Sequence, residues 1–122
     1  MRIFKNKWIT KFADKQGISD SDLIYVAQRA ESGRIDADLG GGVIKQRIAR
    51  KGQGKSGGYR SLILFKRGNR AFFVYAFAKS DRENISIQEL KDLKSLAAII
   101  TQCSDAELES YITKLDLKEL KP

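Results

Sequence analysis

The sequence contains no histidine, and only one cysteine and one proline occur among its 122 residues. Without histidine, the chain cannot build the Ser-His or Cys-His pairs that activate nucleophiles in many hydrolases. The commonest zinc sites are excluded for the same reason, and Cys103 alone cannot form an internal disulfide bond or a multi-cysteine metal site. Any acid–base chemistry must therefore use lysine, tyrosine, a carboxylate or an activated water molecule, and we expect neither a metal nor a cofactor.

Long apolar runs are also missing. Residues 1–15 interleave charged and apolar side chains, so they lack the continuous apolar stretch of a signal peptide. No segment approaches the roughly 20 apolar residues that a membrane-spanning helix needs. We therefore expect a cytoplasmic protein with no membrane partner, folded as a single domain over residues 1–122.

Positive charge is abundant and unevenly distributed. The formal net charge is +8, with 23 Lys and Arg against 15 Asp and Glu. Between Val43 and Arg82 there are eleven basic residues and one acid, so this segment carries +10 and the rest of the chain −2. A basic block within an otherwise near-neutral domain is typical of a surface that binds a polyanion. We call Val43–Arg82 the basic segment and expect it to bind nucleic acid, and specifically RNA.

Apolar spacing predicts two helices before the basic segment. The first begins near Phe4, repeats its apolar residues at positions 8, 9 and 12, and ends at Gly17. The second begins at Ser19, with Asp22 as the partner of a capping box, and ends at Gly33.

Two more helices are predicted after the basic segment. Ser86 with Glu89, and Ser104 with Glu107, are capping boxes that each precede an apolar stripe. Cys103 lies in an apolar stretch and is predicted to be a small buried residue. The last helix, at 104–117, carries Leu108, Ile112 and Leu115 as core residues, or as a docking surface if they are left exposed.

The basic segment itself alternates like a β-sheet. Along Val43–Arg50, Lys45 and Arg47 share one side with Val43, while residues 44, 46 and 48 point the other way. Tyr59–Lys66 and Arg70–Ala78 are rich in aromatic and branched residues and are separated by a short glycine-containing turn at 67–69. Together with a short edge strand expected at Asp36–Leu39, these features predict an α+β fold. We expect an antiparallel sheet of three or four strands, with the two N-terminal and one or two C-terminal helices packed on one face.

A Gly/Lys-rich loop, residues 51–58, joins the first two long strands. Residues 49–56 match a loose nucleotide-binding P-loop, but that motif requires a helix directly after its serine. Here Gly57 and Gly58 lead into a strand instead, so ATP or GTP binding is not expected. The loop is better explained as a basic hairpin whose glycines let the backbone approach a phosphate chain, with Lys51 and Lys55 as donors.

Several cations can converge at one edge of this sheet. They are the loop lysines Lys51 and Lys55, Arg60 on the second strand, and Lys79 and Arg82 after the third. A lysine whose pKa is lowered by neighbouring cations could remove the proton from a ribose 2′-hydroxyl, and arginines could stabilise the charge that develops on the phosphate. A second cation or a tyrosine would protonate the leaving oxygen. Cleavage of this kind needs RNA and no metal, although the same residues could also bind phosphate without cleaving it.

At these residues the sequence resembles a known family. Gly57-Gly58-Tyr59-Arg60 followed by a strand, together with the stretch from Phe77 to Ile85 that leads into Glu89, is similar to the RelE/HigB-type toxins of bacterial toxin–antitoxin systems. The resemblance covers Gly42 to about Thr101 best. It implies a RelE-like α+β toxin domain that cleaves messenger RNA, usually on the ribosome, and that is neutralised by a cognate antitoxin protein.

The resemblance also implies roles for individual residues. Lys51 and Lys55 correspond to loop lysines that act as base and phosphate ligand, and Arg60 to an arginine that contacts the scissile phosphate. Lys79 or Arg82 would occupy the basic position after the last long strand. We expect the other cations and the aromatic ring beside them to contact RNA (Lys45, Arg47, Arg50 and Tyr59).

One departure from the family is visible. Ribosome-dependent members often carry a tyrosine that stacks on the substrate base in the segment after the last basic position, whereas here residues 84–87 contain no aromatic side chain. Tyr75 and Phe77 lie earlier, on the strand, and are expected in the core or in the wall of a groove. The alternative function is a non-enzymatic nucleic-acid-binding module, or a toxin of the same fold that inhibits another target such as gyrase.

Overall fold

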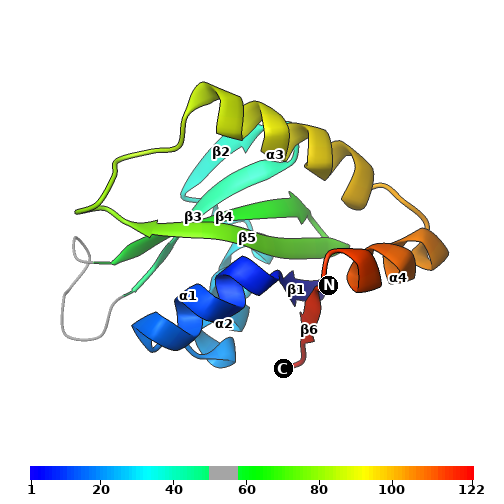
Figure 1. The fold of residues 1–122 in the computed structure, drawn as a ribbon, viewed down its shortest axis with the longest axis horizontal. Helices are drawn as coiled ribbons and strands as arrows, with labels where there is room; N and C mark the ends of the chain where they lie inside the picture. The colour runs from blue at the N-terminus through cyan, green and yellow to red at the C-terminus, as the bar shows by residue number, and fades with distance from the viewer. Residues whose placement is uncertain (50–57) are drawn as a thin grey trace.

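Four α-helices and six β-strands make up the part of the chain that the computed structural model describes, residues 1–49 and 58–122 (Figure 1). In chain order they are β1 (Arg2–Lys5), α1 (Lys7–Gln16), α2 (Asp20–Glu31), β2 (Ala37–Gly40), β3 (Val43–Ile48), β4 (Tyr59–Lys66), β5 (Arg70–Ala78), α3 (Ile87–Ile100), α4 (Asp105–Lys114) and β6 (Lys118–Leu120). None of these helices has the length and apolar character that crossing a membrane requires. The predicted Gly/Lys-rich loop lies, except for Gly58, outside the described residues.

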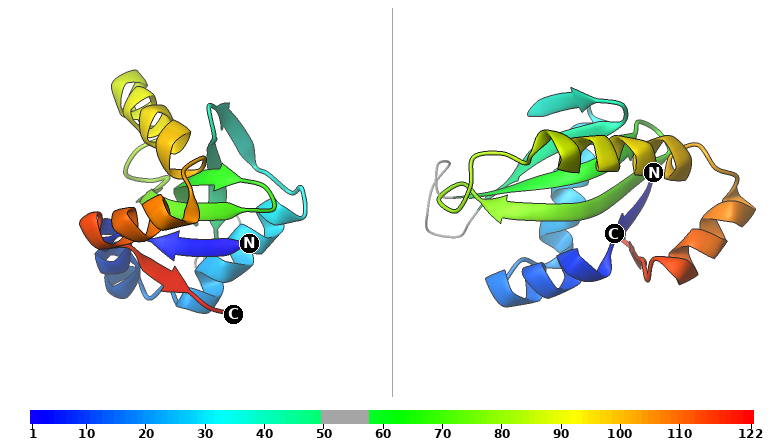
Figure 2. Two further views of the ribbon diagram at one scale, coloured as in Figure 1. Left: turned by 90° about the vertical axis from the view of Figure 1, so that its right-hand side faces the viewer. Right: turned by 45° about the horizontal axis from the view of Figure 1, so that its top comes forward.

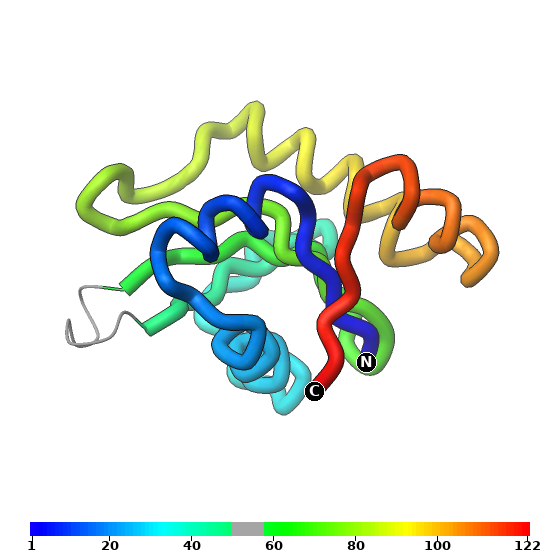
Figure 3. The backbone as a smooth tube through the Cα atoms, turned by 60° about the horizontal axis from the view of Figure 1, so that its bottom comes forward, coloured from blue at the N-terminus to red at the C-terminus, as the bar shows by residue number. Residues whose placement is uncertain are grey.

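All six strands form one sheet in the order β2-β3-β4-β5-β1-β6. The long strands β3, β4 and β5 pair antiparallel as predicted, and β2 forms the expected edge strand one residue later than predicted. The expectation of a purely antiparallel sheet of three or four strands is wrong, because β1 pairs parallel with β5. β6 then pairs antiparallel with β1, so the two ends of the chain lie close together (Figure 3).

The first helix begins at Lys7 and not at Phe4. Asn6 caps it, since the Asn6 side-chain oxygen accepts a hydrogen bond from the Ile9 N–H at 2.8 Å. Phe4 is fully buried in β1, four residues before Trp8, so two residues of different elements reproduce the spacing of a helix. A four-residue strand is too short to reveal its own period in the sequence.

Helices cover both faces of the sheet, and not one face as predicted (Figures 1 and 2). α1 packs on β5 and α2 packs on β3 on one side, here called the α1/α2 face. α3 packs on β3 and β4 on the opposite side, the α3 face. Two separate apolar cores result, one on each face. The residues Leu62–Phe65 of β4 are accordingly all buried, which is typical of a strand covered on both sides.

The predicted capping boxes all form, at Ser19 with Asp22, Ser86 with Glu89, and Ser104 with Glu107. In α4, Leu108 is fully buried and Ile112 packs against the same core on the α3 face, so these two residues are core as predicted. Leu115 is 40% exposed. Cys103 is half-buried at the edge of that core.

Candidate nucleic-acid interface

Two predicted RNA-binding residues of β3 lie on the α3 face. Ile44 and Ile48 belong to the core of the α1/α2 face, so the alternation of the strand turns Lys45 and Arg47 to the other side, where both are half-buried. The backbone of Arg47 is held from outside the strand, because its N–H donates to Asp36 Oδ2 at 2.7 Å. β3 therefore holds the side chains of Lys45 and Arg47 on the α3 face.

Arg60 lies beside them on β4. Tyr59 belongs to the core of the α1/α2 face, so Arg60 points to the α3 face, directly opposite Arg47 on β3 and Phe77 on β5. Placing two arginines opposite each other across neighbouring strands is unfavourable unless an anion lies between or near them.

The guanidinium of Arg60 also has an unused donor. Arg60 Nη1 is buried and has no hydrogen-bond partner among the described residues. A buried polar group of this kind costs about 1–3 kcal/mol when it stays unpaired, so such groups in native proteins usually have a function. A phosphate oxygen would supply the missing acceptor and would offset the repulsion from Arg47.

Arg82 is already engaged by the protein. Its Nη2 donates to Glu89 Oε1 at 2.8 Å, and its Nε donates to the Asn84 carbonyl at 2.8 Å. Its Nη1 lies 3.4 Å from the Tyr75 hydroxyl, and its guanidinium lies over the rings of Tyr75 and Phe77. The hydrogen bond that Arg82 donates to Glu89 raises the pKa of Arg82. The same bond, helped by the Ser86 N–H, lowers the pKa of Glu89 to about 2.

Lys79 follows the last residue of β5. Ala78 pairs with Tyr59, so Lys79 lies at the end of the sheet where Gly58 enters β4, and its side chain is exposed. A Cβ atom added to Gly58 would lie 2.5 Å from the Ile48 carbonyl oxygen, so the chain can approach β3 this closely only with glycine. Lys79 and Arg60 thus lie at the same end of the sheet, as predicted from the antiparallel order.

Tyr59 occupies a different environment from the cations. It is 3% exposed on the α1/α2 face, its hydroxyl donates to Gln16 Oε1 at 2.8 Å, and its ring meets the edge of Phe12. In this position it joins α1 to the sheet, on the face opposite Arg60. The other predicted residues, Arg50, Lys51 and Lys55, lie outside the described residues.

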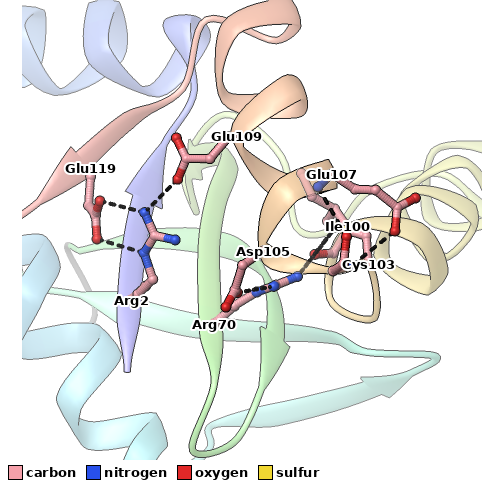
Figure 4. A network of polar contacts seen from close by, with 9 residues as sticks. Arg2, Arg70, Ile100, Cys103, Asp105, Glu107, Glu109 and Glu119 are labelled. Carbon is pink, nitrogen blue, oxygen red and sulfur yellow. Dashed lines mark hydrogen bonds and ion pairs between the residues drawn. The ribbon is translucent and has the colours of Figure 1, made fainter.

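Three cations of the basic segment lie at the opposite, hairpin end of the sheet and bind the protein itself. Arg70 is 3% exposed and donates to the Ile100 carbonyl and to Asp105 (Figure 4). Arg67 Nε donates to the Glu31 carbonyl, and Lys66 Nζ to Gln102. Among the described residues, the charge of the segment is therefore divided between the two ends of β4 and β5, and these three cations at the hairpin end are each bound to other residues of the protein.

The sequence analysis missed a groove beside Arg82. It lies between α3 and the strands β4 and β5, has a volume of about 240 Å³, and is lined by Leu62, Val74, Tyr75, Ile85, Glu89, Asp92 and Leu93. The capping box of α3 was a signal for the position of Glu89, but nothing in the sequence indicated that its carboxylate would bind Arg82.

Comparison with known protein families gives a match. A family model described as the RelE toxin of the RelE/RelB toxin–antitoxin system matches residues 1–120. No curated protein matches the chain.

Proposed function

The chain belongs to the RelE toxin family and is a toxin of a toxin–antitoxin system, which implies a cognate antitoxin as partner; from this premise we propose that it is a metal-independent endoribonuclease. Its substrate is messenger RNA, cut while bound to the ribosome, and the consequence is inhibition of translation. The observation that carries the proposal is Arg60, a half-buried arginine on the α3 face whose buried Nη1 has no partner among the described residues and which has a second arginine directly opposite.

In the proposed reaction, Arg60 and Arg47 hold the scissile phosphate. The ribose 2′-oxygen attacks phosphorus, and its proton passes to a lysine of the 51–55 loop acting as base. The bond from phosphorus to the 5′-oxygen breaks, and the leaving oxygen takes a proton from a cationic side chain. We assign this role to Lys79, which is exposed at the same end of the sheet as Arg60. The planar fork of an arginine fits the oxygens of the phosphorane, and its fixed position costs no reorganisation as their charge grows.

Arg82 has a different part in this proposal. A phosphate could use the donors of Arg82 only by displacing Glu89, whose carboxylate is bound at 2.8 Å and 3.4 Å. We therefore assign Arg82 to positioning: it connects the segment after β5 to the N-terminus of α3 and covers Tyr75 and Phe77. Lys45 and Arg47 extend the cationic surface along β3.

The proposal is tested by expression of the wild-type chain and two variants. Arg60→Ala removes the proposed phosphate ligand. Arg34→Ala is the control, because it removes the same charge from an exposed arginine that lies outside the strands carrying Lys45, Arg47 and Arg60. We expect growth arrest and new 5′ ends within messages for wild type and Arg34→Ala, but not for Arg60→Ala. Rescue by the product of the adjacent gene would identify the antitoxin. If expression stops growth while messages stay full length, the cleavage assignment is wrong, and gyrase inhibition becomes the function to examine.

A further inference from the structure

Trp8 is a large apolar residue that stays exposed on the surface. It is the only tryptophan in the chain, it lies in the first turn of α1, and it is 42% exposed. Its ring stacks on Phe12 at 5.2 Å and lies 4.4 Å from the ring of Tyr75 on β5. One side of the indole is thus supported by aromatic rings, while a large part of it stays open to solvent.

The contact between Trp8 and Tyr75 depends on a β-bulge in β5. Leu62 pairs with Tyr75 and Ile63 with Phe73, so Val74 is an extra residue in β5. β1 pairs with β5 only as far as Phe73, so the later part of β5 is not covered by β1. α1 runs beside that part of β5 toward the end of the sheet near Gly58 (Figure 3). The bulge at Val74 and the early end of β1 let Tyr75 contact both α1 and Arg82.

These rings form a continuous path to the phosphate site. Tyr75 lies 6.1 Å from Phe77, Arg82 covers both rings, and Phe77 is directly opposite Arg60. An aromatic surface next to a cationic backbone site is the usual arrangement for binding single-stranded nucleic acid, because bases stack while cations hold the phosphates.

The exposed side of α1 carries matching charge. Lys11 and Lys15 follow Trp8 by three and seven residues, so the three side chains share one stripe of the helix, and both lysines are exposed. The exposed Asp14 follows Lys11 by three residues, so one acid lies at the margin of this stripe. A helix surface that combines lysines with an exposed aromatic ring favours binding of a nucleic acid, which carries both phosphates and base rings.

We propose that Trp8, supported by Tyr75, is the surface on which a base of the RNA strand stacks, at the far end of the aromatic path that leads from Arg60 through Phe77 and Tyr75. The proposal rests on the proposed RNA cleavage and adds the residue that orients the substrate strand. The base stacks on the exposed side of the indole and does not enter between the two rings, since rings 4.4 Å apart leave no room for about 3.5 Å of contact on each side.

Trp8 reports on its own contact, because no other tryptophan emits. The probes are two 2′-O-methylated hexanucleotides, which lack the attacking hydroxyl and are not cleaved: one of mixed sequence, and one with the same backbone but without bases. Stacking predicts that the first quenches Trp8 emission in proportion to binding, measured separately by anisotropy of a labelled end. The abasic strand should bind through its phosphates without this quenching. Equal quenching by both strands, or binding of the first without quenching, overturns the proposal.

Variants supply a second readout. Trp8→Ala should lower affinity for the mixed-sequence strand by on the order of tenfold and leave affinity for the abasic strand unchanged, while Trp8→Phe should retain part of the difference. Ile99→Ala is the control, since Ile99 is an apolar residue of α3 that is 49% exposed and lies next to Ile100, whose carbonyl binds Arg70 at the hairpin end of the sheet. Far-UV circular dichroism excludes unfolding. If Trp8→Ala binds both strands like wild type, the proposal fails while RNA cleavage still stands. If Trp8→Ala instead loses only the antitoxin, the surface binds protein and the proposal is likewise overturned.

Discussion

Substituting Arg70 tests whether the basic segment divides into a binding end and a structural end. Arg70 is 3% exposed at the start of β5, and its Nη1 donates to the Ile100 carbonyl at 3.0 Å. Its ion pair with Asp105 spans 2.9 Å, but the Asp105 side chain is 91% exposed. Burial and the carbonyl contact, and not the ion pair, should therefore determine its contribution to stability.

The expected cost of Arg70→Ala follows from these contacts. Loss of a hydrogen bond from a charged group to a buried carbonyl costs about 1.5–3 kcal/mol. Two buried methylene groups add about 1.6 kcal/mol, and an exposed ion pair at most about 1 kcal/mol. The sum is about 4 kcal/mol, which at about 4 °C per kcal/mol lowers Tm by roughly 15 °C. Asp105→Ala should cost less than about 1 kcal/mol. Arg70→Met keeps most of the apolar stem and removes the unpaired Nε, so it should cost about 2 kcal/mol.

Urea unfolding, followed by circular dichroism, measures all three variants. RNA affinity is then measured below the unfolding transition, where Arg70→Met should bind like wild type because Arg70 lies at the hairpin end of the sheet. The reasoning would be refuted if Asp105→Ala cost as much as Arg70→Ala, or if folded Arg70→Met bound RNA many times more weakly.

Three further predictions concern the end of the sheet near Gly58. Because the pKa of Glu89 is lowered, its ion pair with Arg82 stabilises the fold above pH about 4.5 and loses this effect as the pH falls toward about 2. The difference in urea midpoint between wild type and Glu89→Gln should therefore vanish over that pH range. A difference that stays constant with pH would contradict this prediction. Arg47→Ala should reduce the slope of log affinity against log salt by about 0.7, whereas Arg67→Ala at the hairpin end should leave the slope unchanged. Gly58→Ala should destabilise the fold by about 1–3 kcal/mol, because the new methyl group would meet the Ile48 carbonyl, and calorimetry showing an unchanged Tm would contradict this.

The central part of the fold was predictable from the sequence. The alternation of apolar and basic residues predicted β3, the content of aromatic and branched residues predicted β4 and β5, and the turn at 67–69 predicted that β4 and β5 run antiparallel. The capping boxes gave the starts of three helices, since a serine and an acid three residues later satisfy a purely local geometry. That frame was enough to place Arg60 and Lys79 at the same end of the sheet.

The outer strands and the second covered face were not predicted. β1 and β6 have four and three residues, and their pairing depends on contacts between the two ends of the chain. The buried run Leu62–Phe65 was an available signal that both faces are covered, and it was not used. The bond between Arg82 and Glu89, the unpaired Nη1 of Arg60, and the contact of Trp8 with Tyr75 depend on side-chain conformations, on which sequence periodicity carries no information.

The central claim is that Arg60 binds the scissile phosphate and stabilises the charge that develops during cleavage. The most direct test measures two quantities for wild type, Arg60→Ala and Arg34→Ala: the single-turnover cleavage rate of a messenger RNA on the ribosome, and the affinity for an uncleavable 2′-O-methylated copy of that message. We predict that Arg60→Ala lowers the rate by about 100- to 1000-fold while affinity falls by about 1–3 kcal/mol, and that Arg34→Ala changes neither. Equal losses of rate and affinity in Arg60→Ala, or cleavage that persists without Arg60, would contradict the claim.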